Sequence, residues 1–177
     1  MSLPLAGAHA AYSTGASSWA PGNTVTLDTV TAAAGSSGAF AILLDNSDAV
    51  ASGQLRFTFA ATLGVEIAGV QITDRTTGFE SIGSAYATGD DALLGYQILF
   101  YNLNRLDISP GAGPILTVAY STTATATGSS PLHITQSILA SAAAESLGVT
   151  AVDGALTIAE VPVTPLSHQL YLPLIHR

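Results

Sequence analysis

Residues 106–120 have the sequence LDISPGAGPILTVAY, which places a broken backbone directly before an apolar strand. Glycine and proline fill the run 110–114 apart from one alanine, and they supply the positive and fixed φ values that turns require. The residues that follow alternate between the two faces of an extended strand, with Leu116, Val118 and Tyr120 on one face and Ile115, Thr117 and Ala119 on the other. This stretch predicts a turn that leads into a buried strand.

The same alternation recurs on both sides of this stretch. Residues 52–60, SGQLRFTFA, direct Leu55, Phe57 and Phe59 inward. Further strands are predicted at 23–32, 38–46, 65–74, 92–102, 114–122, 130–140 and 149–159, with Gly-, Asp- and Pro-containing turns between them. The Ala-rich residues 138–148 fit a helical turn, a strand or a loop equally well. The pattern predicts an all-β fold, an antiparallel β-sandwich of jelly-roll type with about nine strands.

The length of 177 residues suits one domain with two tails. We expect a leader or extended arm at 1–22, the sandwich at 23–160 and a Pro-containing apolar tail at 161–177. Ala8-His9-Ala10 resembles a signal-peptidase site, but no positive segment precedes it, so an export signal at 1–10 stays an open alternative. Together with the absence of Cys and the Thr/Ser-rich composition, this favours an extracellular or cell-surface protein.

Charge excludes several classes of partner. The chain has 4 basic residues against 12 acidic ones, a formal net charge of −8, and its arginines are scattered. Without a basic patch, nucleic acid is not an expected partner, and no window approaches the ~18–20 apolar residues of a membrane span. The chain is therefore predicted to bind neither nucleic acid nor a membrane.

Residues suited to catalysis are also missing. There is no G-x-S-x-G motif, the acids fall mostly in turns, and His133 is the one histidine within the predicted sandwich, where it alternates outward with Leu132 and Ile134. The glycine run at 111–113 lacks the Lys and the following helix of a phosphate site. No catalytic residue is predicted, and the chain is not expected to be an enzyme.

Oxygen-rich turns at 45–48 and 89–91 are candidates for Ca²⁺, although turn formation alone explains their acids. No metal-ligand set and no cofactor are predicted, and Ca²⁺ stays an open alternative. Aromatic residues are too scattered for a flat glycan platform, which makes carbohydrate binding the weakest of the functional hypotheses.

A family resemblance follows from the order of these features. VTLDTVTAAAGSSGAFAILLDN (25–46), GYQILFYN (95–102), ISPGAGPILTVAY (108–120) and the closing segment 130–159 are similar, in order and spacing, to strands of the cohesin domain. Cohesins are β-sandwich modules that bind dockerins on bacterial scaffold proteins. The chain departs from the family at Ala60-Ala61, where Asp-Pro is common, and it lacks the family's acidic and Asn cluster.

The resemblance implies that strands 52–60 and 92–102 share the sheet that receives dockerin. Alternation places Tyr96, Ile98 and Phe100 inward. The predicted partner-binding face then consists of the outward residues of both strands: Ser52, Gln54, Arg56, Thr58, Gln97, Leu99 and Tyr101. A solvated sheet without a partner is the alternative interpretation.

The tail supports a second hypothesis. Prolines at 162, 165 and 173 disfavour a helix, yet the segment is more apolar than a linker, with Leu170, Tyr171, Leu172, Leu174 and Ile175 close together. Such a segment could add as a strand to a neighbouring copy and form a filament, a surface layer or another homopolymer. The sequence thus favours a protein-binding module, with a self-assembling structural subunit as the alternative.

Overall fold

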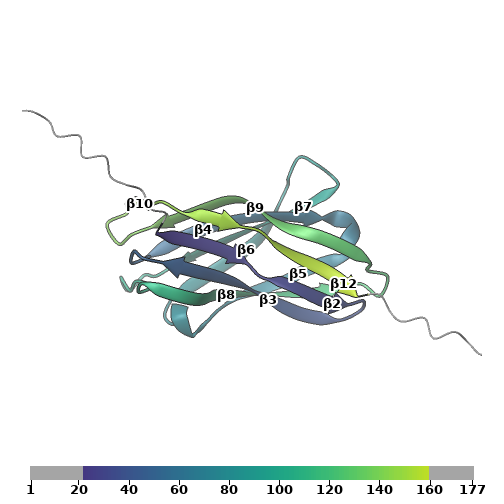
Figure 1. Ribbon diagram of the computed structural model, residues 1–177, viewed down its shortest axis with the longest axis horizontal. Helices are drawn as coiled ribbons and strands as arrows, with labels where there is room; N and C mark the ends of the chain where they lie inside the picture. Colours follow the sequence, from purple (N-terminus) through teal and green to yellow (C-terminus); the bar gives the residue numbers. More distant parts are fainter. Residues whose placement is uncertain (1–21, 160–177) are drawn as a thin grey trace, which may run out of the picture.

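The computed structural model of the protein describes residues 22–159, which form two β-sheets packed face to face (Figure 1). One sheet has five strands, in the order β11 (Thr150–Val152), β1 (Asn23–Leu27), β3 (Ser37–Asn46), β8 (Gly111–Thr122) and β5 (Val65–Ile72). The other has seven, in the order β2 (Thr29–Ala33), β12 (Gly154–Ala159), β9 (Gly128–Ala140), β4 (Ser52–Ala60), β7 (Leu93–Tyr101) and β6 (Glu80–Tyr86), with β10 (Ser146–Leu147) beside β9. The prediction of an all-β sandwich is confirmed.

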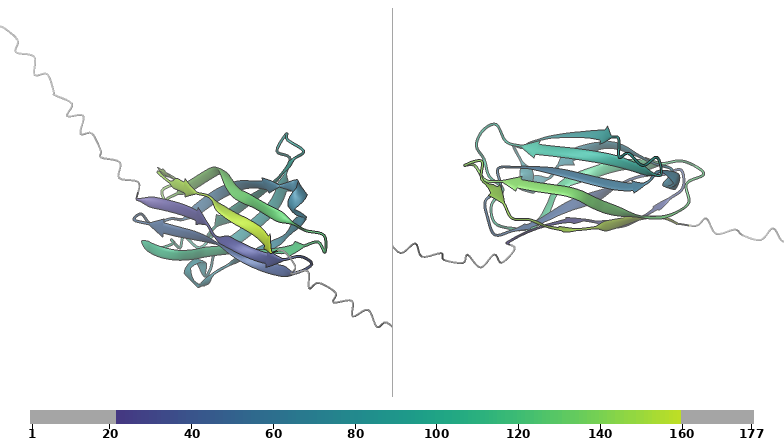
Figure 2. Two further views of the ribbon diagram at one scale, coloured as in Figure 1. Left: turned by 45° about the vertical axis from the view of Figure 1, so that its right-hand side comes forward. Right: turned by 90° about the horizontal axis from the view of Figure 1, so that it is seen from above.

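The two terminal regions of the sandwich each contribute to both sheets. The predicted strand 23–32 divides at Asp28 into β1 and β2, and the predicted strand 149–159 divides at Asp153 into β11 and β12. Because these regions run in the same direction, β1 pairs with β11 and β2 pairs with β12 in parallel. The predicted antiparallel pairing holds for all other neighbouring strands of the described residues, and these two pairs are the exceptions. The described chain begins and ends at opposite ends of the long axis (Figures 1 and 2).

The strand count also differs from about nine, because the described residues form twelve strands. Two of the additional strands come from the divisions just described. β6 was not predicted, since its sequence ESIGSAY offers little apolar alternation. The undecided segment 138–148 contains no helix: β9 continues to Ala140, and β10 pairs back onto it after a turn.

The core lies between the sheets and contains the side chains that alternation directed inward. The residues predicted inward on β4 and β7, and those predicted to share one face of β8, are all buried: Leu55, Phe57, Phe59, Tyr96, Ile98, Phe100, Leu116, Val118 and Tyr120. Ile115 is also fully buried, contrary to its predicted place on the other face. Since Ile42 pairs with Leu116 and Leu43 with Pro114, Ile115 is the extra residue of a β-bulge, and the alternation restarts there. The structure contains no described helix long and apolar enough to span a membrane.

The run 110–114 does not form the predicted turn. From Gly111 onward it is the first part of β8 and pairs with the end of β3. Gly111 and Gly113 have φ values of 144° and 148°, a backbone region that suits glycine. β5 ends at Ile72, so this part of β8 has no strand on its other side.

Side chains from the short 3₁₀ helix η2 (Asp74–Thr76) and its flank take the place of that missing strand. The Thr73 and Thr76 hydroxyls donate to the carbonyls of Pro114 (2.7 Å) and Ile115 (2.6 Å). The Arg75 guanidinium continues the series with bonds to the carbonyls of Leu44, Ser109, Gly111 and Gly113 and to the side-chain oxygen of Asn46. Burial lowers the pKa of Arg75, and the charge of Asp45 acts in the opposite direction.

Candidate functional site

The predicted partner-binding face forms a regular grid on the outside of the seven-stranded sheet. β4 lies between β9 and β7, and β7 lies between β4 and β6. Across β4 and β7 the predicted residues pair directly: Ser52 with Tyr101, Gln54 with Leu99, and Arg56 with Gln97. The two strands predicted to share a sheet are therefore neighbours in it, and their outward side chains lie in register. Whether a partner binds there stays a prediction.

One row across the grid has apolar side chains at three of its four positions. Ile138 of β9 pairs with Gln54, Gln54 with Leu99, and Leu99 with Ile82 of β6. The three apolar side chains are 41%, 39% and 56% exposed, respectively. They cross four adjacent strands, a width of about 14 Å at ~4.8 Å per strand. We call Ile138, Leu99 and Ile82 the apolar row.

Two members of the apolar row were missed by sequence reasoning. Ile82 lies on the unpredicted strand β6. Ile138 has the same parity as Leu132 and Ile134, so simple alternation would direct it into the core. A β-bulge at Thr135 shifts the register between β4 and β9 and turns Ile138 outward, while Leu139 becomes buried. A bulge of this kind leaves no clear signal in a single sequence.

The next row is polar and held together by hydrogen bonds. Arg56 Nε donates to Gln97 Oε1 at 2.6 Å, and its guanidinium lies 5.4 Å from the centre of the Tyr86 ring. Gln136, which pairs with Arg56, accepts a bond from Gln54 Nε2 at 3.3 Å, which links this row to the one that contains Ile138 and Leu99. These bonds fix the direction of long side chains before any partner arrives, which reduces the entropy lost on binding.

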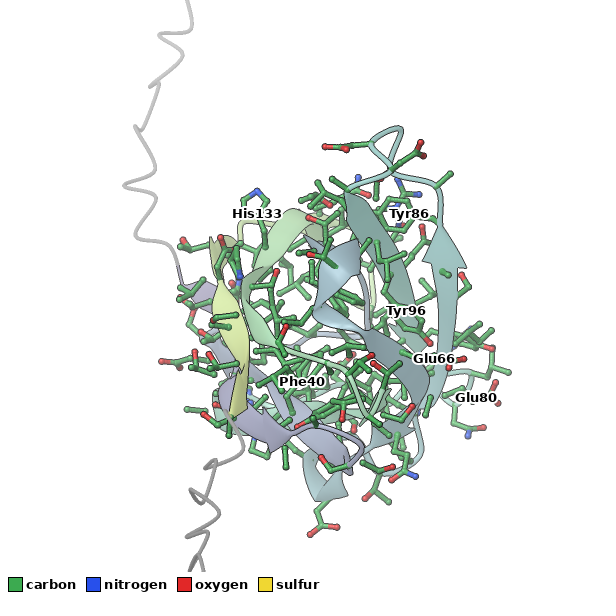
Figure 3. The ribbon with its side chains drawn as sticks, turned by 90° about the vertical axis from the view of Figure 1, so that its right-hand side faces the viewer. Phe40, Glu66, Glu80, Tyr86, Tyr96 and His133 are labelled. Atoms are coloured by element: carbon green, nitrogen blue, oxygen red, sulfur yellow. The ribbon has the colours of Figure 1, made fainter. Side chains whose placement is uncertain are left out.

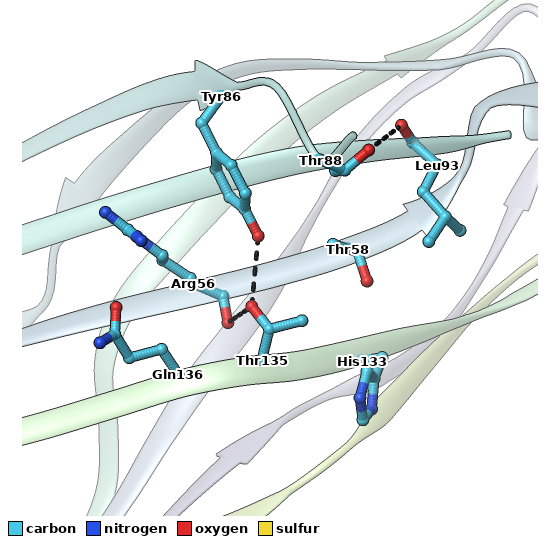
Figure 4. A pocket seen from close by; sticks show the side chains of 8 residues that line it. All are labelled: Arg56, Thr58, Tyr86, Thr88, Leu93, His133, Thr135 and Gln136. Atoms are coloured by element: carbon cyan, nitrogen blue, oxygen red, sulfur yellow. Dashed lines mark hydrogen bonds between the residues drawn. The ribbon is translucent and has the colours of Figure 1, made fainter. Parts of the chain in front are cut away.

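Tyr86 crosses the outer face from β6 toward β9. Its ring lies over Gly95, where a Cβ would come within 2.7 Å of the ring, and its hydroxyl is 3.2 Å from Thr135 Oγ1. Beside this bridge is a hollow of about 480 Å³ between Arg56, Thr58, Leu93 and His133 (Figure 4). Thr58 lies on the predicted face and lines this hollow, but it is only 7% exposed, and its role in binding stays a prediction.

The opposite end of the grid is also hollowed. A second depression, of about 670 Å³, lies between Ser52, Tyr101, Ala140 and the loop residues Leu103 and Arg105. Tyr101 donates its hydroxyl to Glu80 Oε2 at 2.8 Å, and this bond to a carboxylate raises the pKa of Tyr101. The apolar row thus runs between two depressions.

His133 is directed outward, as predicted, and its side chain is 59% exposed. Its Nδ1 lies 2.6 Å from Asp153 Oδ2, and the backbone N–H of Ile134 donates to Asp153 Oδ1 at 2.8 Å. Partial burial opposes ionisation of Asp153, but these bonds and the His133 charge prevail and lower its pKa below the ordinary value of 3.8. Asp153 therefore fastens the point where the chain passes from β11 to β12 onto β9.

This arrangement predicts a pH dependence of stability. A carboxyl with a depressed pKa in the folded state stabilises the fold above its unfolded pKa and loses that contribution as the pH falls through the folded pKa. We expect Asp153→Asn to be less stable than the wild type at pH 5 and above, and the difference to shrink below pH ~3.8. Urea denaturation at intervals from pH 5 to pH 2.5 measures the difference. A difference that stays constant over this range would contradict the assignment.

In both turns considered for Ca²⁺, an Asp carboxylate accepts a hydrogen bond from the protein itself. Asn23 donates to Asp48 Oδ2 at 3.0 Å, and Asp90 Oδ1 accepts from the N–H of Ala92 at 2.9 Å. Within residues 22–159, no three His, Asp or Glu side chains gather closely enough to hold a metal ion. Turn formation accounts for these carboxylates.

Comparison with known proteins bears on the fold. No family model and no curated protein matches the chain. Among solved structures, the non-cellulosomal cohesin from the archaeon Archaeoglobus fulgidus matches with a TM-score of 0.60 and 19% identity, over 78% of this chain and 91% of that one. The fold is cohesin-like. The sixth cohesin of scaffoldin B from Acetivibrio cellulolyticus, solved in complex with a Cel5 dockerin, matches with a TM-score of 0.61 and 15% identity, over 78% of this chain and 99% of that one.

A cohesin from Clostridium thermocellum, OlpC, solved in complex with a dockerin, also matches, with a TM-score of 0.61 and 12% identity over 80% of this chain and 96% of that one. The resemblance noted from the sequence is thereby confirmed at the level of the fold. The departure from the family sequence at Ala60-Ala61 lies where β4 ends and the 3₁₀ helix η1 (Ala61–Leu63) begins.

Proposed function

We propose that the chain is a non-catalytic, extracellular protein-binding module, and that its partner binds the outer face of β9, β4, β7 and β6. The observation that carries this proposal is the apolar row, in which three large exposed side chains line up in register beside a polar row that includes Arg56 and Gln97. A central apolar strip with a polar surround is the usual composition of a protein interface. Two of the similar cohesins were solved in complex with dockerins, so a dockerin-like module is the first partner to test.

The face contains a single guanidinium, that of Arg56, at the edge of the apolar row. Its Nε is occupied by Gln97 and one side of it by the Tyr86 ring, so the rest of the group is available to an acceptor on the partner. We therefore expect an aliphatic surface beside an acidic or carbonyl group on the partner. A glycan is a weaker candidate, because Tyr86 is the one aromatic ring lining the hollow beside Arg56.

Assembly of copies through a terminal strand is the alternative function. The residues it would use, Leu170 to Ile175, lie outside the described part of the chain. The described chain begins and ends at opposite ends of the sandwich, which favours a head-to-tail arrangement (Figure 2). Light scattering and electron microscopy of the purified protein test it directly: filaments that need residues 166–177 support it, and a monomer at all concentrations contradicts it.

Charge placed in the apolar row should abolish partner binding. We expect Ile138→Asp and Leu99→Asp to weaken binding at least about 30-fold, the loss that corresponds to ~2 kcal/mol at an interface hot spot. Arg56→Glu should have a similar effect by reversing the one positive charge. The measurement is binding of dockerin modules selected from a displayed library against the wild-type domain.

The matched control for this experiment is Ile72→Asp. Ile72 of β5 is as exposed as Ile138, 41% in both cases, but belongs to the other sheet. Circular dichroism and melting of all four variants separate loss of folding from loss of binding. Unchanged affinity in folded Ile138→Asp and Leu99→Asp, or equal losses in Ile72→Asp, would remove the outer face as the binding site.

A further inference from the structure

The sandwich is open along one side, between β5 and β6. These strands form the edges of the two sheets, and an apolar slot of about 240 Å³ separates them near Val65 and Tyr86. Figure 3 shows Glu66, Tyr86 and Tyr96 on this side of the molecule, away from β12. Farther along, Val70 packs close to Gly83 and closes the gap. The slot is therefore the unclosed end of the core.

Apolar side chains of the inner face are left uncovered in the slot. Leu94 pairs with the buried Phe59, which places it on the inner face of its sheet, yet it is 42% exposed. Phe59, Val65, Ile67 and Tyr96 are among the other apolar residues of the lining, and Glu66 is its one charged residue. At ~25 cal/mol per Å² of apolar surface, covering these side chains would stabilise whatever segment binds there.

The strand edges beside the slot are also unprotected. Within residues 22–159, β6 pairs only with β7, and β5 only with β8, so each has one free edge. Edge strands are usually shielded by Lys, Pro or a charge that points inward. β6 has the sequence ESIGSAY, in which Glu80 at its start is the only charged residue, and no residue is Lys or Pro.

We propose that the apolar segment 170–175 of the same chain binds along the free edge of β6 and covers the slot. Its sequence, LYLPLI, suits this place. In an extended segment, Leu170, Leu172 and Leu174 share one face, and their N–H and C=O groups share one edge. Pro173 and its missing N–H then fall on the opposite edge, the one arrangement in which a strand tolerates proline. The three leucines can thus enter the slot while their backbone groups pair with β6.

The chain leaves the described domain at the end where the slot lies. Ala159 pairs with Ala33, the Ala33 carbonyl accepts a hydrogen bond from Thr122 Oγ1 at 2.8 Å, and Thr122 pairs with Val65 in the slot. Each of these three contacts joins neighbouring backbones ~5 Å apart, so Ala159 lies about 15 Å from Val65. Residues 160–169 can extend to ~33 Å, so the segment reaches the slot of its own domain. A tethered segment has an effective concentration in the millimolar range, which favours its own domain over a second copy.

Hydrogen exchange of the full chain tests the proposal. We compare the wild type with a tail variant in which Leu170, Leu172 and Leu174 are each replaced by Ser, and with a control variant in which His168→Ser and Gln169→Ser leave the leucines in place. The amides of β6 should exchange about tenfold more slowly in the wild type and control than in the tail variant, which corresponds to ~1.4 kcal/mol. Equal exchange of β6 in all three would overturn the proposal.

A second pair of variants tests the slot itself. Leu94→Asp should remove the protection of the β6 amides from exchange. Leu93 is adjacent and 37% exposed but lies on the outer face, so Leu93→Asp should leave that protection in place. Light scattering over a hundredfold range of protein concentration identifies the occupant. Protection in a monomer at every concentration supports the same chain, and protection that arises only with oligomers would overturn it in favour of a second copy. Binding by the outer face is measured separately, so the two proposals fail independently.

Discussion

Gly154→Ala is expected to destabilise the domain by about 3 kcal/mol, near the upper end of the usual cost of overpacking a core. Gly154 is the first residue of β12, at the point where the chain enters the second sheet. A Cβ at this position would lie 2.2 Å from the carbonyl oxygen of Asp28 and 2.5 Å from that of Leu27. Asp28 is the corresponding point between β1 and β2, so the two crossings of the sandwich touch at Gly154. The obstructing atoms are backbone and cannot rotate away.

Thermal and urea denaturation measure this effect. For a domain of this size, ~3 kcal/mol corresponds to a fall in Tm of about 6–12 °C. Gly69→Ala is the matched control, because Gly69 also lies in a strand and no heavy atom comes within 4 Å of its added Cβ. If Gly154→Ala and Gly69→Ala had the same Tm, the close contact between the two crossings would not explain why position 154 requires glycine.

The parts of the fold that follow strict alternation could be predicted from the sequence. Leu55, Phe57 and Phe59 on β4 and Tyr96, Ile98 and Phe100 on β7 are buried as expected, because each strand is regular over that stretch. The register of β4 against β7 then brings the predicted outward residues together. A period of two residues needs no information from the rest of the chain.

What could not be predicted depends on interruptions of that period. The bulges at Ile115 and Thr135 each shift the alternation by one residue, which buries Ile115 and exposes Ile138. The parallel pairs depend on where the chain changes sheets, at Asp28 and Asp153, and neither residue differs locally from an ordinary turn former. Of the apolar row, the sequence therefore identified only Leu99.

The two proposed binding surfaces use different properties of the same sheet. The outer face offers side chains, since its backbone groups are already paired between β9, β4, β7 and β6. The free edge of β6 offers backbone groups and the slot behind them. Ile82 and Tyr86 belong to both regions, because they lie on the edge strand and face outward beside Leu99 and Gly95. A segment bound along β6 would therefore extend the outer face by one strand.

Arg75 is expected to be the most important charged side chain for stability. Its guanidinium donates to four backbone carbonyls and one amide oxygen around the first residues of β8, where no neighbouring strand exists. Removing a partner from buried acceptors costs roughly 1–3 kcal/mol for each group left unsatisfied, and water can reach some of these. We expect Arg75→Ala to lower the free energy of unfolding by about 3–4 kcal/mol.

Arg75→Lys separates the geometry of the guanidinium from its charge. Lysine keeps the charge but has three donors on one nitrogen, whereas the two terminal nitrogens of Arg75 together serve five acceptors. We expect it to recover less than half of the loss, whereas Arg105→Lys, in the loop before β8, should melt with the wild type. Limited proteolysis should cut Arg75→Ala first within 106–114, because the loop there leads into the first residues of β8, which have only β3 to pair with. If Arg75→Lys were as stable as the wild type, the positive charge, and not the five hydrogen bonds of the guanidinium, would stabilise the start of β8.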